Sequence, residues 1–158
     1  MNRQAFALLL LFFVLPLGLS SLAASQASAA QKWVQSGRVL VIGNDRGGLL
    51  KDRARLVEQL RRDGRKVEIR GNLCLSSCTM FLGARNVCVN PNTVFGFHGP
   101  SSYGRPLPRD QFDFWSNVMS RNFPAKLRGV FMASWRHRID GYESVSGAQL
   151  IRQGFRSC

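Results

Sequence analysis

Acidic residues are scarce in this chain. Its 158 residues include nine Asp and Glu against 22 Lys and Arg, which gives a formal net charge of +13. Such an imbalance attracts anionic partners, for example an anionic surface or a glycan. The arginines are scattered and form no block with interleaved aromatic residues, so we expect no nucleic-acid site. A solvated basic face without a partner explains the same composition.

Long apolar runs are missing except near the N-terminus. Arg3 precedes an apolar run at 5–19, and 27–29 (Ala-Ser-Ala) has the small-x-small pattern of a cleavage site. This order predicts a secretory signal peptide over residues 1–29, cleaved on export to the periplasm or the outside. Pro16 and Gly18 interrupt the run, whose unbroken part is shorter than the ~20 residues of a membrane span. An uncleaved anchor is therefore the less favoured alternative.

Cleavage would leave residues 30–158, a length that suits one domain. Arg3 is the only charge in 1–29, so its loss would change the net charge from +13 to +12. No cysteine lies near the cut, which argues against a lipid-anchored protein. We find no internal repeat and no low-complexity segment in this part.

All four cysteines, Cys74, Cys78, Cys88 and Cys158, lie beyond the predicted signal. An even number in an exported chain indicates disulfides, with three connectivities open. The spacing of Cys74 and Cys78 is not the tight pair of a structural zinc site, and neither histidine is near them in sequence. We expect disulfides rather than a metal site, and no cofactor.

The hydrophobic pattern predicts an α/β fold. The β-branched run at 38–42 is typical of a buried strand, and a glycine-containing turn follows at 44–48. Apolar residues then recur at helical spacing over 49–62 with charges on the other face, and Gly64 suits the C-cap. A strand at 66–69 completes a strand–helix–strand unit, which implies a parallel sheet.

Further elements are expected toward the C-terminus. They are a buried helix at 79–84, strands within 86–97, a loop at 99–108, helices over 112–119 and after Pro124, and a last short helix opened by a capping box at 146–149.

Three features carry chemistry. The pair Gly47-Gly48 lets backbone amides approach a ligand. Ser76 lies at a strand-to-helix junction, where a helix N-terminus stabilises developing negative charge. His98 ends an apolar strand and could act as general base for a serine hydroxyl. Each feature alone is equally explained by an ordinary turn, a helix cap or a structural histidine.

Taken together, these features resemble the Clp-peptidase/crotonase superfamily. Its peptidases carry a glycine turn like 44–48, a serine before a small-residue helix, and a strand with His-x-Pro at its end, like 89–100. Ser76 precedes His98 by 22 positions (98 − 76), close to the family interval. Predicted periplasmic members with a Cys-x-Ser-x-Cys-Thr signature are more similar still, matched here by 74–79 and by Gly-Phe-His at 96–98.

The resemblance covers residues 38–100 well and 140–155 loosely. It implies a small β-β-α spiral of the Clp-peptidase/crotonase type with a mainly parallel sheet. The N-terminal strand–helix unit that relatives place before the glycine turn is lacking here, and their turn proline is Arg46.

The resemblance also implies site residues. Ser76 would be the nucleophile, with Ser77 as an alternative, and His98 the base. The amides of Gly48 and Ser77 would form the oxyanion hole. Disulfides Cys74–Cys78 and Cys88–Cys158 would fix the serine turn and the chain end. The third catalytic acid falls on no clear position: Asp140 is favoured, and the other candidates are Glu143, Asp110 and Asp113.

Two hypotheses follow. The first is an exported serine hydrolase acting on a peptide or another acyl bond. The second is a catalytically degenerate, basic periplasmic binding domain on the same scaffold. A coenzyme A reaction is disfavoured because no adenine-binding feature is visible. Phe112, Phe114 and Trp115 in one helix suggest self-association into a homo-oligomer, or simply complete the core.

Overall fold

The structure, a computed structural model, describes residues 33–36 and 38–158 and has an α/β fold. The predicted signal peptide lies outside these residues. Within the described part of the chain, no helix has both the length and the apolar character needed to cross a membrane.

The larger sheet has the order β1-β2-β3-β5-β10. Its strands are β1 (Trp33–Ser36), β2 (Val39–Ile42), β3 (Lys66–Ile69), β5 (Asn86–Val89) and β10 (Arg156–Ser157). The last four are mutually parallel, and β1 is antiparallel to β2. The predicted strands at 38–42 and 66–69 and the predicted parallel sheet are confirmed. Strand β1 was not predicted from the sequence.

The smaller sheet has the order β4-β6-β9. It contains β4 (Leu73–Leu75), β6 (Val94–Phe97) and β9 (Glu143–Ser146), with β4 parallel and β9 antiparallel to β6. The predicted loop at 99–108 contains a short hairpin of β7 (Ser101–Ser102) and β8 (Arg105–Pro106), because its tip at 103–104 adopts positive φ.

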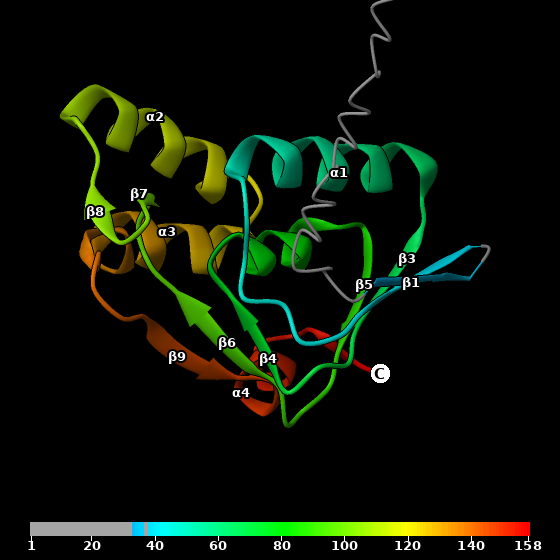
Figure 1. The fold of residues 1–158 in the computed structure, drawn as a ribbon. Coiled ribbons are helices and arrows are strands. Elements are labelled where there is room, and N and C mark those ends of the chain that lie inside the picture. The colour runs from blue at the N-terminus through cyan, green and yellow to red at the C-terminus, as the bar shows by residue number, and fades with distance from the viewer. Residues whose placement is uncertain (1–32, 37) are drawn as a thin grey trace, which may run out of the picture.

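The chain repeats one order of elements. A strand of the larger sheet leads to a segment of the smaller sheet and then to a helix: β3, β4 and η1 (Ser76–Gly83), then β5, β6 and α2 (Arg109–Ser120). The first pass is β2, a single bridge at Asp45 beside β4, and α1 (Leu50–Asp63). Figure 1 shows these helices together on one side of the strands.

Helix α1 confirms the predicted amphipathic helix, with Val57 and Leu60 buried and Gly64 as a left-handed C-cap at φ 62°. One prediction about it is wrong. The charges do not all face solvent, because Arg53 lies on the buried face and is 3% exposed. Its charge is compensated inside the protein, as described below.

The later helices also follow the sequence, with shifted bounds. The predicted helix at 79–84 is a 3-10 helix that already begins at Ser76. The helices after it are α2, α3 (Ala125–Ala133), η2 (Trp135–His137) and α4 (Gly147–Arg152). The predicted capping box opens α4: Gln149 N–H donates to Ser146 Oγ at 3.1 Å, and Ser146 N–H donates to Gln149 Oε1 at 2.7 Å.

The core lies between the sheets and these helices. Its largest fully buried side chains include five phenylalanines, Phe81, Phe95, Phe97, Phe123 and Phe131. The ring of Phe97 contacts that of Phe123 edge-on, with centroids 5.6 Å apart. On α2, by contrast, Phe114 is 59% exposed, so it does not complete this core.

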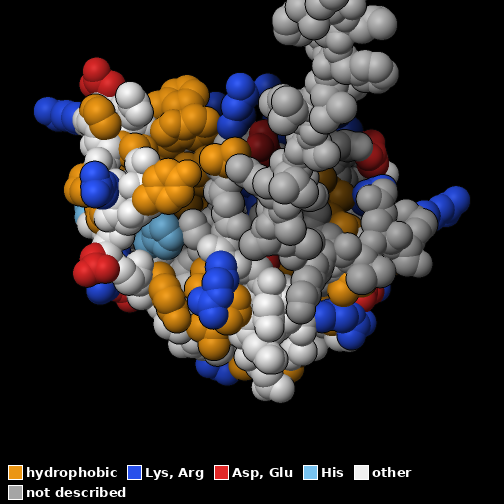
Figure 2. Space-filling view, in the orientation of Figure 1, with side chains coloured by type: hydrophobic (Ala, Val, Ile, Leu, Met, Phe, Trp, Pro, Cys, Tyr) orange, Lys and Arg blue, Asp and Glu red, His pale blue; other side chains and the backbone are white. Residues whose placement is uncertain are grey.

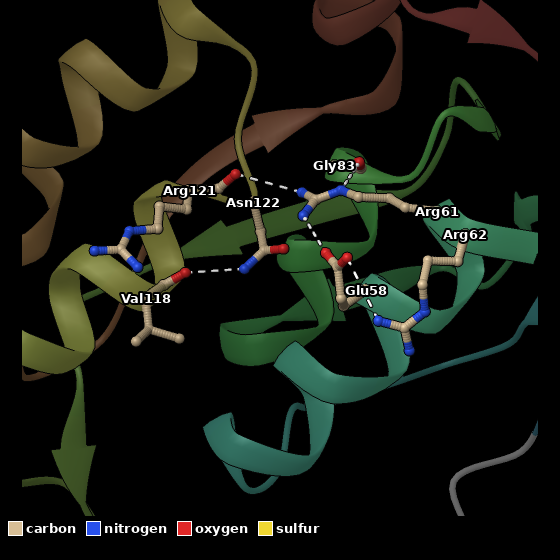
Figure 3. Close-up of polar contacts among 7 residues, drawn as sticks. All are labelled: Glu58, Arg61, Arg62, Gly83, Val118, Arg121 and Asn122. Carbon is tan, nitrogen blue, oxygen red and sulfur yellow. Dashed lines mark hydrogen bonds and ion pairs between the residues drawn. The ribbon is translucent and has the colours of Figure 1, made fainter.

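Arg61 links helices α1, η1 and α2 through hydrogen bonds (Figure 3). From α1, its Nε donates to the carbonyl oxygen of Gly83 at 2.8 Å and its Nη2 to that of Arg121 at 3.3 Å. It therefore satisfies carbonyls at the ends of η1 and α2, which are left without helical partners there.

Both expected disulfides are present, Cys74–Cys78 and Cys88–Cys158. The first joins β4 to η1 across Ser76. The second joins the last residue of the chain to β5. Such bonds are typical of an oxidising compartment.

Candidate active site

Three neighbouring segments, the one at Asp45, β4 and β6, run parallel, so their C-terminal ends lie at the same end of the smaller sheet. Cys74 of β4 is bridged on one side to Asp45 and paired on the other with Phe95 of β6. Neighbouring segments of a sheet lie about 4.8 Å apart. The glycine turn, Ser76 and His98 each follow one of these segments, so residues that are far apart in sequence emerge side by side.

Ser76 has the most unusual backbone of the site. Its φ is 58°, and it is one of two non-glycine residues with positive φ in the described part of the chain. This conformation is strained and persists only where the surroundings impose it. Here the Cys74–Cys78 disulfide spans the residue. A serine on a strained strand-to-helix turn is the arrangement of the nucleophile elbow in hydrolases.

The structure separates the two candidate nucleophiles. Ser76 is partly exposed and lines a cleft, whereas Ser77 is 0% exposed. The Oγ of Ser77 is buried and has no hydrogen-bond partner within the described residues. Only Ser76 can meet a substrate without a rearrangement. Ser77 is the second residue of η1, so its N–H is one of the amides without a helical acceptor.

The cleft beside Ser76 has a volume of about 700 Å³, within the usual range of ligand pockets. Its wall comes from the glycine turn, the start of α1, the β7–β8 hairpin and α2, with Gly48, Leu49, Tyr103, Leu107 and Trp115 among the lining residues. Figure 2 shows that apolar side chains gather on this face of the molecule, over α2 and the hairpin.

Gly47 lies against Ser76. A Cβ atom on Gly47 would be 2.7 Å from Ser76 Cβ and 3.1 Å from Ser76 Oγ, and the residue has a φ of 102°. Both the contact and the φ require glycine. The glycine turn thus lies directly against Ser76, and Gly48 lines the cleft.

His98 follows β6 and is partly exposed. Its Nδ1 lies 2.7 Å from the carbonyl oxygen of Gly99. A carbonyl only accepts, so a hydrogen bond here needs the proton on Nδ1, and in the neutral imidazole Nε2 is then the acceptor. Within the described residues, no hydrogen bond joins His98 to Ser76, and His98 is not part of the cleft wall.

The candidate acids lie elsewhere. Asp140 is exposed and lines a separate cavity of about 400 Å³ together with His137 and Glu143. Glu143 accepts from Arg138, Asp113 pairs with Arg136, and Asp110 is exposed at the start of α2. In the part of the chain that the structure describes, none of these four carboxylates accepts a hydrogen bond from His98.

Sequence reasoning missed a buried ion pair next to the glycine turn. Arg53 Nη2 lies 2.8 Å from Asp45 Oδ2, and the two side chains are 2% and 1% exposed. The guanidinium also lies over the ring of Phe81, 4.4 Å from its centroid. Burial lowers the pKa of Arg53, and the Asp45 carboxylate opposes this effect. The available signal was the position of Arg53 on the apolar stripe, three residues after Leu50.

The described residues contain no group of three or more His, Cys, Asp or Glu side chains that could hold a metal ion. Comparison with known proteins finds no matching family model, no similar curated protein and no similar solved structure. The functional argument therefore depends on the geometry of this site.

Proposed function

We propose that this protein is an exported serine hydrolase that cleaves a peptide or another acyl bond, with Ser76 as its nucleophile. The observation that carries the proposal is the strained backbone of Ser76 at φ 58°, at the edge of a cleft and against the glycine turn. Strain of this kind is concentrated at functional sites.

The repeated order of two strands and a helix supports a small Clp-peptidase/crotonase-like spiral as the scaffold. The second and third passes each contribute a strand to both sheets before their helix, and they supply β4 with Ser76 and β6 with His98. The first pass supplies the glycine turn. The two disulfides support the exported location.

In the proposed reaction, Ser76 Oγ attacks the carbonyl carbon of the substrate while His98 Nε2 takes the hydroxyl proton. The carbonyl of Gly99 holds the other ring nitrogen as Nδ1–H. The amides of Gly48 and Ser77 bind the oxyanion of the tetrahedral intermediate. His98 then returns the proton to the leaving group, and a water molecule hydrolyses the acyl-enzyme with the same base.

This assignment replaces a catalytic aspartate with a backbone carbonyl. A carbonyl fixes the tautomer of the histidine as a carboxylate does, but it offers less stabilisation to the imidazolium that forms. We therefore expect a slow hydrolase. Closure of the distance between Ser76 and His98 on substrate binding is part of the proposal, because catalytic hydrogen bonds are often formed only in the complex.

The test is covalent labelling of the purified, disulfide-bonded protein by a fluorophosphonate. The wild type should be labelled at Ser76, and Ser76→Ala and His98→Ala should not be. Ser101→Ala is the matched control, because Ser101 lines the same cleft and should leave labelling unchanged. Labelling that survives Ser76→Ala contradicts the assignment.

A non-catalytic binding domain on the same scaffold is the second candidate. The observation in its favour is that no hydrogen bond joins Ser76 and His98 within the described residues. It predicts that folded protein fails to react with the fluorophosphonate, yet binds anionic vesicles or glycans with an affinity that falls steeply with salt. This expectation follows from the net charge of +12 that remains after the predicted cleavage.

A further inference from the structure

We infer that Asp45 and Arg53 are positioning residues that hold the glycine turn against Ser76. The inference rests on the proposed function, because it assigns them a part in presenting the oxyanion-binding amide. Neither side chain lines the cleft, and neither residue is proposed to contact the substrate.

Asp45 is fixed from several sides. Its N–H donates to the carbonyl oxygen of Leu73 at 3.1 Å, and its own carbonyl accepts from Leu75 N–H at 2.8 Å. Its side chain then reaches forward, where Oδ1 accepts the N–H of Gly47 at 2.8 Å. One residue therefore joins the glycine turn to the strand that ends at Ser76.

Arg53 extends this contact to the helices. Its ion pair with the other carboxylate oxygen, Oδ2, joins the turn to α1. Its guanidinium lies over Phe81, which is fully buried and belongs to η1, the helix that Ser76 opens. The pair thus contacts the three elements that surround the nucleophile: the turn, the helix after the turn, and the helix after the serine.

Stability alone is a weak explanation for this pair. Taking two charges out of water costs free energy that their attraction returns only in part, and apolar replacements of such pairs are often neutral or stabilising. What an apolar pair cannot provide is an acceptor for the amide of Gly47. The Gly47 N–H is directed at Asp45 Oδ1, and the next residue, Gly48, lines the cleft. We therefore assign the Gly48 amide as the one that faces the substrate. The carboxylate therefore selects which peptide of the turn faces the substrate.

Three variants separate the hydrogen bond from the charge. Asp45→Ala removes both. Asp45→Asn keeps a side-chain oxygen for Gly47 but removes the carboxylate charge beside the buried guanidinium of Arg53. Asp45→Asn with Arg53→Met keeps the oxygen and removes both charges. Glu68→Gln is the matched control, because it neutralises another buried, ion-paired carboxylate that lies on β3 outside the turn.

The first readout is amide hydrogen exchange of Gly47 by NMR, measured on the folded, disulfide-bonded variants. We expect exchange to accelerate at least tenfold in Asp45→Ala, and to remain slow in the double variant and in Glu68→Gln. Unchanged exchange of Gly47 in folded Asp45→Ala overturns the inference, whatever the activity of the protein.

The second readout is the reaction with the fluorophosphonate, separated into the maximal rate and the half-saturating concentration. Removing one oxyanion donor costs about 10²–10³ in rate. We expect Asp45→Ala to lose a large part of that rate with unchanged half-saturation, and the double variant to recover it. A thermal shift with an unchanged rate in Asp45→Ala would mean a purely structural role and would also overturn the inference. Failure of the wild type to react contradicts the proposed hydrolase instead, and the exchange experiment still decides the role of Asp45.

Discussion

Gly47 packs so closely against Ser76 that a side chain at position 47 would clash with the serine: a Cβ on Gly47 would be 2.7 Å from Ser76 Cβ. The contact joins a turn that follows the first strand of the parallel set to a serine that opens a helix about thirty residues later in the chain. Any change at Gly47 therefore acts directly on the candidate nucleophile.

Gly47→Ala should abolish labelling of Ser76 and lower stability by about 1–3 kcal/mol, because it adds a clash to a φ of 102°. Thermal unfolding and labelling rate measure the two effects. Gly64→Ala is the control: it has a φ of 62° but no atom within 4 Å of its would-be Cβ, so it should lower stability and leave labelling intact. Equal labelling in both variants would contradict the role of the contact.

The tautomer of His98 is open to direct measurement. We expect ¹⁵N NMR to show the proton on Nδ1, because Gly99 offers only an acceptor. Asp140→Asn should then leave the labelling rate unchanged, since Asp140 is exposed beside a different cavity. A catalytic aspartate would instead be worth about 10⁴-fold, so a loss of that size would restore Asp140 as the third residue.

The two disulfides should contribute differently to stability and to the labelling rate. In a chain-entropy account, the bond between Cys88 and Cys158, 70 positions apart, contributes about 4 kcal/mol, and the bond between Cys74 and Cys78, four positions apart, about 2 kcal/mol. Replacing the first pair by alanine should lower the melting temperature more. Replacing the second should lower the labelling rate more, because that bond spans Ser76. The reverse order in both measurements would show that the short bond has no role at the site.

Glu68 should make the free energy of unfolding depend on pH in the acid range. Hydrogen bonds from Lys66 and then from Arg70 lower the pKa of its carboxyl below the ordinary value of 4.5. Because the folded-state pKa is the lower one, its stabilisation is present above pH 4.5 and is lost as pH falls toward the folded pKa. Both partners are more than a third exposed, so we expect only about 1 kcal/mol.

The measurement is thermal unfolding of the wild type and Glu68→Gln between pH 7 and pH 3. The wild type should be the more stable at neutral pH, and the difference should shrink as the pH falls. A difference that stays constant over this range would contradict the role assigned to Glu68.

Much of the site was predictable because its signals are local. The glycines of the turn, the serine after an apolar strand and the cysteines on either side of it can all be read within a few residues. Which of the two adjacent serine hydroxyls faces the cleft could not be predicted from local sequence. Ser76 and Ser77 are adjacent and chemically identical, and only the packing of η1 buries the second of them.

The sequence by itself determined the strand–helix–strand unit of β2, α1 and β3, the caps at Gly64 and Ser146, and the residue types available for chemistry. Periodicity and turn preferences act over short distances. Tertiary structure alone decided that Asp45 and Arg53 form a buried pair, that Asp140 faces another cavity, and that the glycine turn, Ser76 and His98 share one edge. Those relationships depend on strand pairing between distant segments, and no local pattern encodes the register of that pairing.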